Sequence, residues 1–145
     1  MSFIGRTPDP AAQNQHSPVT SQVMLSPMRP SALKVAIAAR RYLKARRWRE
    51  AMLPNNMFAD PAWDILLDLY ASESEGLAVS VSDACHAASV PATTALRWLS
   101  RLEQAGLIER SPDPLDARRI FLTLKEPART VLHDWLAGLF IADRV

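Results

Sequence analysis

The chain has 145 residues and a formal net charge of +2; 48% of its residues are hydrophobic and 22% are charged. This is enough for one ordinary domain with a buried core, and the balance excludes a wholly disordered chain. The single cysteine, Cys85, excludes an internal disulfide framework. No apolar run approaches the roughly 20 residues of a membrane helix, so we expect a soluble, cytoplasmic protein that contacts no membrane.

Charge is unevenly distributed along the chain. Residues 29–52 carry eight lysines and arginines against one glutamate, whereas residues 60–145 carry eight basic and 13 acidic side chains. Such separation indicates contacts with partners rather than a type of fold. The basic segment could bind nucleic acid, or its cations could pair with acidic surface in the same fold or in a second subunit.

The N-terminal part of the chain predicts an arm followed by a long helix. Residues 1–30 hold five of the eleven prolines and show no apolar period, so we expect a disordered arm ahead of a single domain at 31–145. Ser31 is a suitable N-cap for a helix over 32–52. Most arginines lie off the apolar stripe of that helix, which is formed by Val35, Ala38, Tyr42 and Ala45.

A second helix and a short strand are predicted next. Asp60 can cap this helix and Pro61 suits its first position. Its buried face is formed by Trp63, Leu66, Leu67 and Tyr70. Residues 77–81 are short and β-branched, which is typical of an edge strand.

Two helices separated by a tight turn follow. Ser82 or its neighbour would cap a short helix over 83–88, and a longer helix over 91–105 starts at a proline. Gly106 suits a left-handed C-terminal cap for the longer helix.

The C-terminal third predicts a hairpin and a last helix. Strands at 107–110 and 119–124 are joined by a polar loop with two prolines and two aspartates. The last helix, over 126–142, carries a wide apolar stripe that suggests an interface, formed by Val131, Leu132, Trp135, Leu136, Leu139 and Phe140.

This order of elements predicts a mainly α fold with a small β-hairpin wing, a winged helix-turn-helix flanked by N- and C-terminal helices. A helix fits the major groove of B-DNA, and basic residues on a hairpin can reach phosphates or the minor groove. Inward-facing apolar residues on helix 91–105 leave four polar side chains outward: Thr93, Thr94, Arg97 and Arg101.

Residues 90–124, VPATTALRWLSRLEQAGLIERSPDPLDARRIFLTL, resemble the winged-helix core of the MarR family of bacterial transcription regulators. The similar parts are Arg101-Leu102-Glu103 with Gly106-Leu107-Ile108-Glu109-Arg110, and Asp113-Pro114 followed by Asp116-x-Arg118. The resemblance implies a homodimer that binds double-stranded DNA, with helix 91–105 in the major groove and wing 111–119 at the minor groove or backbone. It further implies that Arg118 is the wing contact and Asp116 organises the wing, and that the groove-facing segment includes Pro91, Ala92, Thr93, Thr94 and Arg97.

Together these observations favour a DNA-binding transcription regulator, in which Arg101 and Arg119 add phosphate contacts. Two alternatives stay open: a winged-helix protein–protein module without DNA binding, and a replication or partition factor of a mobile element. The sequence contains no phosphate loop, nucleophile elbow or clustered histidines, so we expect no enzyme activity, cofactor or metal site. It does not identify a small-molecule effector.

Overall fold

The computed structural model describes residues 30–54 and 57–140. All of the predicted N-terminal arm except Pro30 lies outside these residues. Along the chain the elements are α1 (Ala32–Met52), α2 (Pro61–Ser74), β1 (Val79–Ser80), α3 (Val81–Ala87), α4 (Ala92–Gln104), β2 (Ile108–Pro112), β3 (Ile120–Leu124) and α5 (Glu126–Phe140).

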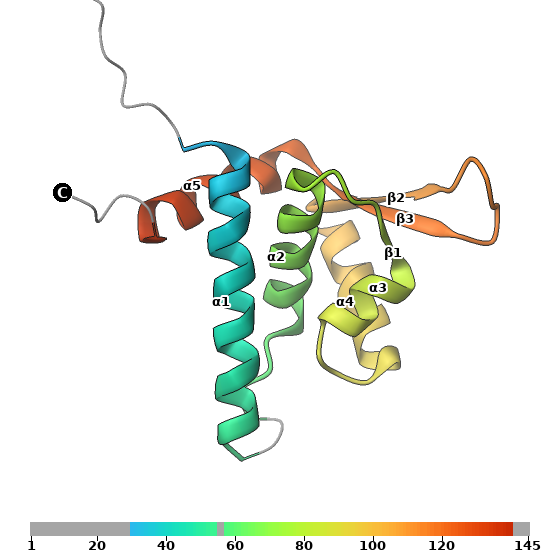
Figure 1. The fold of residues 1–145 in the computed structure, drawn as a ribbon. Coiled ribbons are helices and arrows are strands. Elements are labelled where there is room, and N and C mark those ends of the chain that lie inside the picture. The colour runs from blue at the N-terminus through green and yellow to red at the C-terminus, as the bar shows by residue number, and fades with distance from the viewer. Residues whose placement is uncertain (1–29, 55–56, 141–145) are drawn as a thin grey trace, which may run out of the picture.

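The fold is the predicted winged helix-turn-helix with flanking helices. α2 lies between α1 on one side and the pair α3 and α4 on the other (Figure 1). The β2–β3 hairpin projects away from α1, and α5 packs against α1 and α2. The fold therefore separates the hairpin and α4 from the long N-terminal helix.

Helix starts follow the sequence closely where a capping side chain is present. Ser31 accepts a hydrogen bond from Lys34 N, and Asp60 accepts one from Trp63 N, so α1 and α2 begin where predicted. The prediction for α3 was wrong by two residues. Ser80 rather than Ser82 caps it, through a capping box in which Ser80 Oγ accepts from Asp83 N and Asp83 accepts from Ser80 N.

The predicted strand at 77–81 is reduced to Val79 and Ser80, because Ser80 also caps α3 and Val81 already belongs to that helix. The sheet order is β1-β3-β2, which makes β1 an edge strand as expected. Both pairings are antiparallel, with Val79 opposite Leu122 and Ile108 opposite Leu124. Residues 111 and 112, expected in the loop, extend β2.

The buried stripe of α1 differs from the predicted one. Ala45 is exposed and Tyr42 and Ala38 are half-buried. The residues that pack inward are Val35, Ala36, Ala39, Leu43 and Arg46. The helix is rotated relative to the prediction because one arginine enters the interface with α2, where a buried carboxylate receives it.

The apolar stripe of α5 divides into two faces. Leu132 and Leu136 are buried in the core, whereas Val131, Trp135, Leu139 and Phe140 are between 40% and 67% exposed. Trp135 stacks edge-on against Trp63, with ring centroids 4.9 Å apart. The other half of the stripe therefore leaves apolar side chains on the surface of α5.

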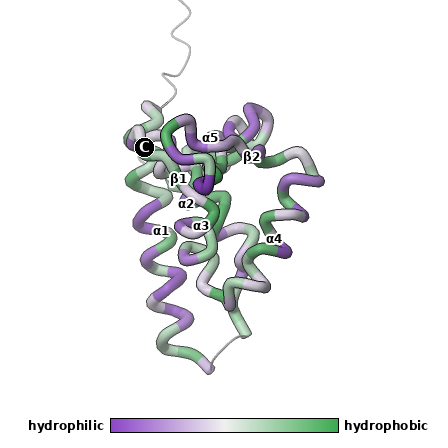
Figure 2. Tube along the Cα trace, turned by 90° about the vertical axis from the view of Figure 1, so that its right-hand side faces the viewer, coloured by the Kyte–Doolittle hydropathy of each residue, from purple (hydrophilic) through white to green (hydrophobic). Residues whose placement is uncertain are grey.

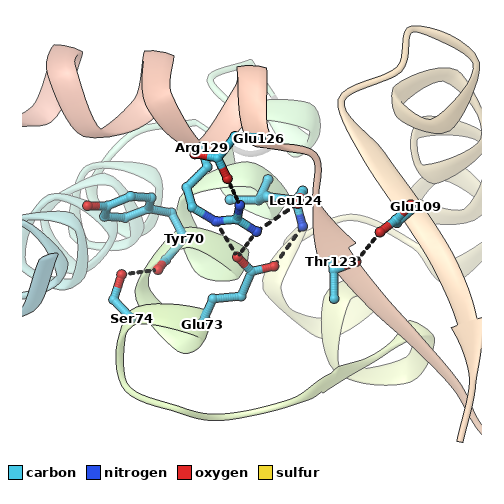
Figure 3. Close-up of polar contacts among 8 residues, drawn as sticks. All are labelled: Tyr70, Glu73, Ser74, Glu109, Thr123, Leu124, Glu126 and Arg129. Atoms are coloured by element: carbon cyan, nitrogen blue, oxygen red, sulfur yellow. Dashed lines mark hydrogen bonds and ion pairs between the residues drawn. The ribbon is translucent and has the colours of Figure 1, made fainter.

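A polar cluster joins α2, β3 and α5 (Figure 3). Glu73 Oε1 accepts a hydrogen bond from Leu124 N at 2.6 Å, and Glu73 Oε2 accepts from Arg129 Nη2 at 2.9 Å. Arg129 Nη2 also donates to Leu124 O at 2.8 Å. This cluster fixes the inner end of the hairpin to the helical core.

Candidate nucleic-acid interface

The turn between α3 and α4 positions the candidate recognition helix. Ser89 has φ of 56°, an uncommon left-handed conformation for a residue other than glycine, and Ser89 N donates to His86 O. Pro91 occupies the N-cap position of α4. Ala95, Leu99 and Leu102 are buried, so the opposite face of α4 is directed away from the core.

The predicted contact residues of α4 lie mostly on that outward face. Pro91, Ala92, Thr93 and Arg97 are exposed, while Thr94 is half-buried. Arg97 makes neither an ion pair nor a side-chain hydrogen bond within residues 30–54 and 57–140. Its guanidinium is therefore available for an external acceptor.

Two further polar residues share the outward face and were missing from the predicted set. Ser100 and Gln104 follow Arg97 at spacings of three and seven residues, which places all three on one side of the helix. Both are exposed. They line a surface depression of about 580 Å³ together with Thr94, Leu96, Arg97, Trp98 and Arg101. Helical periodicity could have identified them.

The wing is shaped by two aspartates. Asp113 Oδ1 accepts a hydrogen bond from Leu115 N at 2.8 Å, and Asp116 Oδ1 accepts one from Arg118 N at 3.0 Å. Backbone bonds from Asp113 N to Arg119 O and from Arg119 N to Asp116 O, both 2.9 Å, close the turn. Asp116 thus orders the backbone directly beside Arg118.

The wing tip also carries an apolar residue that sequence inspection did not single out. Leu115 is 96% exposed, held between two residues of the hydrogen-bonded turn. Exposure of a lone leucine is ordinary on a protein surface. Leu115 lies shortly before the exposed Arg118 and Arg119, so the wing presents apolar and basic side chains together.

The other basic residues near the interface differ in how far they are engaged. Arg118 has no side-chain partner in the part of the chain that the structure describes. Arg119 lies over the ring of Phe121, and Arg101 over the ring of Trp98, at 5.8 and 5.1 Å from the ring centroids.

The charge of Arg119 acts on the carboxylate of Asp83, in the first turn of α3. Hydrogen bonds from Ser80 hold the pKa of the Asp83 carboxyl below its ordinary value, and the positive charge of Arg119 lowers it further. Arg119 therefore faces both the wing surface and an acidic group of its own fold.

The arginines of α1 are arranged differently. Arg46 Nε donates to Asp64 Oδ1 at 2.6 Å and Arg47 Nη1 to Asp64 Oδ2 at 2.9 Å, and Asp64 is completely buried. Arg40 donates to Asp68 and Ser72 on α2 and to Glu75, the C-cap residue of that helix. Burial lowers the pKa of Arg46, but the hydrogen bond and charge of Asp64 outweigh burial and raise it above its ordinary value. Three of the eight cations in the basic segment are thus neutralised inside the fold.

Cys85 has the surroundings of a structural thiol. It is half-buried, and burial raises the pKa of its thiol despite the nearby charge of Arg110. A raised thiol pKa disfavours the reactive thiolate. Within residues 30–54 and 57–140, no cluster of three or more His, Cys, Asp or Glu side chains could hold a metal ion. None of the described helices combines the length and apolar character needed to span a membrane.

The arrangement of α3, α4 and the hairpin defines a winged helix-turn-helix protein. Residues 60–120 match the model of the MarR family. The matched segment overlaps the motifs that carried the resemblance in the sequence. Members of the family are transcription regulators rather than enzymes.

Solved structures with a similar chain include the PcaV transcriptional regulator from Streptomyces coelicolor in complex with its natural ligand, at 23% identity and a TM-score of 0.46, covering 69% of this chain and 67% of that chain. MepR from S. aureus in its DNA-binding conformation is 23% identical, with a TM-score of 0.48 and 74% of each chain covered. Wild-type MarR from E. coli in its apo form is 18% identical, with a TM-score of 0.46, covering 76% of this chain and 73% of that chain. Comparison with curated proteins found no match.

Proposed function

We propose that this protein is a dimeric, sequence-specific regulator of transcription that binds double-stranded DNA through α4 and the wing. The observation that carries the proposal is the pair of exposed, unpartnered guanidinium groups, Arg97 on α4 and Arg118 on the wing, within the described residues. Arg97 lies on the exposed face of α4, and Arg118 lies on the wing, which projects from the core (Figure 1). Cations held in this way can neutralise phosphates without breaking an internal ion pair.

In this proposal α4 enters the major groove and its outward side chains contact base edges. Arg97 can bind guanine or a phosphate in a bidentate manner, and Thr93 can bond to either. Pro91 and Ala92 at the start of α4 approach the groove closely, while half-buried Thr94 supports the phosphate backbone. These positions determine sequence preference.

The wing, residues 111–119, reaches the minor groove or the backbone. Asp116 orders the turn so that Arg118 points away from the core, and Arg119 and Arg101 add phosphate contacts. These contacts contribute affinity more than specificity, so their loss weakens binding to all sequences alike.

The apolar surface of the two terminal helices supports the proposed dimerisation. An apolar cavity of about 520 Å³ lies between α1 and the end of α5, lined by Lys34, Ile37, Ala38, Arg41, Tyr42, Ala45 and Phe140. Ile37 is 54% exposed beside it. A second copy of the chain would cover this surface and present two α4 helices to a palindromic site.

The test is fluorescence anisotropy with the DNA upstream of the protein's own gene, a scrambled duplex and salt between about 50 and 300 mM. We expect selective binding that weakens with salt, and Arg97→Ala should cost about 1–3 kcal/mol on the preferred duplex alone. Failure to bind either duplex at the lowest salt would overturn the proposal and favour a protein–protein module.

A further inference from the structure

One side chain of α1 bridges three helices. Arg47 Nη1 donates to Asp64 Oδ2 on α2, and Arg47 Nη2 donates to the backbone oxygen of Ala87, the last residue of α3. We propose that Arg47 is a positioning residue that holds the end of α3, and through it α4, in the orientation that binds DNA. The affinity part of this proposal rests on the proposed function.

The anchoring end of the bridge is firmly held. Asp64 has no exposed surface and accepts hydrogen bonds from Arg46 and Arg47 on separate carboxylate oxygens. Glu50 lies 3.7 Å from Arg47 Nη1 and balances the second positive charge. Two cations and two carboxylates form a neutral group. Rotation of the Arg47 guanidinium away from this group would break its ion pairs with Asp64 and Glu50.

The other end of the bridge meets α3 where its own hydrogen bonding stops. The last carbonyls of a helix lack intrahelical donors, and Ala87 O receives its donor from Arg47. The next residue, Ala88, is completely buried, and Ser89 follows in the left-handed conformation of the turn. Without Arg47, a carbonyl beside a buried residue loses its partner immediately before the strained turn.

Arg40 provides a matched comparison on the same helix. It also donates to carboxylates of α2 and of its C-cap, namely Asp68 and Glu75, but its described partners include no atom of α3. Loss of Arg40 therefore weakens the α1–α2 contact alone. A role in positioning α3 predicts different consequences for substitutions of Arg40 and Arg47.

The experiment compares the full-length protein with the variants Arg47→Met, Arg47→Lys and Arg40→Met, each measured well below its unfolding midpoint. One measurement is amide hydrogen exchange of the segment 86–90; the other is anisotropy with the preferred duplex. We expect Arg47→Met to speed exchange in this segment and weaken DNA binding, each about tenfold. Arg47→Lys, which places a single ammonium between two acceptors, should give an intermediate result, and Arg40→Met should change neither measurement more than about twofold.

The outcomes separate the two proposals. Equal effects of Arg40→Met and Arg47→Met, or unchanged exchange at 86–90 in Arg47→Met, would overturn the positioning role. Absence of DNA binding by the unsubstituted protein would overturn the proposed function instead, while the exchange measurement would still decide whether Arg47 holds the end of α3.

Discussion

Arginines of α1 are paired with carboxylates of the same fold, whereas arginines of α4 and the wing are not, in the part of the chain that the structure describes. On α1, Arg40, Arg46 and Arg47 all donate to carboxylates of α2. On α4 and the wing, Arg97 and Arg118 have no such partner within the described residues. Figure 2 shows hydrophilic stretches recurring along α1, the more conspicuous of the two regions by sequence.

The difference shows that charge density along a chain is a poor guide to where a polyanion binds. The acidic residues that make 60–145 net negative include Asp64, Asp68 and Glu75, and these neutralise the basic helix within the same fold. The sequence had left internal pairing and nucleic-acid contact equally open for that helix. The structure favours internal pairing for its inward arginines.

The strongest test of this contrast removes the buried acceptor. We expect Asp64→Asn to lower the free energy of unfolding by about 3–5 kcal/mol, because two guanidinium groups, one of them on a 6%-exposed side chain, lose their countercharge. Urea denaturation followed by circular dichroism measures it.

A double substitution, Asp64→Asn with Arg46→Met, serves as the control for this prediction. It removes one of the stranded cations and should recover part of the lost stability. A cost for Asp64→Asn no larger than that of an exposed ion pair, below about 1 kcal/mol, would show that α1 and α2 do not depend on this group.

Sequence patterns predicted most of the fold because local signals determine it. Ser31 and Asp60 cap the starts of α1 and α2, and Gly106 follows the end of α4 with a positive φ. Each lies in the structure where the sequence predicted it. The rotation of α1 could not be predicted in this way. It depends on the pairing of Arg46 with Asp64, 18 positions along the chain, and a hydropathy stripe treats both residues as surface.

A second test compares one exposed cation from each region. Arg118→Ala should weaken DNA binding about tenfold. It should also reduce the slope of log affinity against log salt by about 1, the change expected for the loss of one phosphate contact. Lys44 is exposed on α1, has no described partner and does not line the apolar cavity, so Lys44→Ala is a matched loss of charge away from α4, the wing and the proposed dimer surface. Anisotropy over a salt series measures both.

The expected contrast is a large effect of Arg118→Ala and a small one of Lys44→Ala, with unfolding free energies nearly unchanged. Equal effects on the salt slope would mean that α1 also contacts DNA, and the contrast between α1 and the wing would then be wrong. Charge along the sequence could not rank these two residues, and only the resemblance of the wing motif singled out Arg118.

The smallest expected effect concerns the surroundings of Arg119. This residue is intermediate between the arginines of α1 that pair with carboxylates and the arginines of α4 and the wing that do not. It is exposed on the wing, yet its charge acts on Asp83, whose carboxyl accepts from Ser80 Oγ at 2.6 Å and from Ser80 N at 3.0 Å. Ser80→Ala removes the cap of α3 and should cost about 1 kcal/mol at neutral pH.

The pH dependence of that cost follows from the sign of the Asp83 shift. Because the pKa of Asp83 is lowered in the folded state, its stabilisation is complete above the carboxyl's ordinary pKa and is lost as the pH falls through the lowered value. The stability difference between the unsubstituted protein and Ser80→Ala should therefore be larger at about pH 7 than at about pH 3, as measured by urea denaturation at both. A difference that stays constant with pH would assign the whole effect to the bond between the Ser80 hydroxyl and Asp83 N.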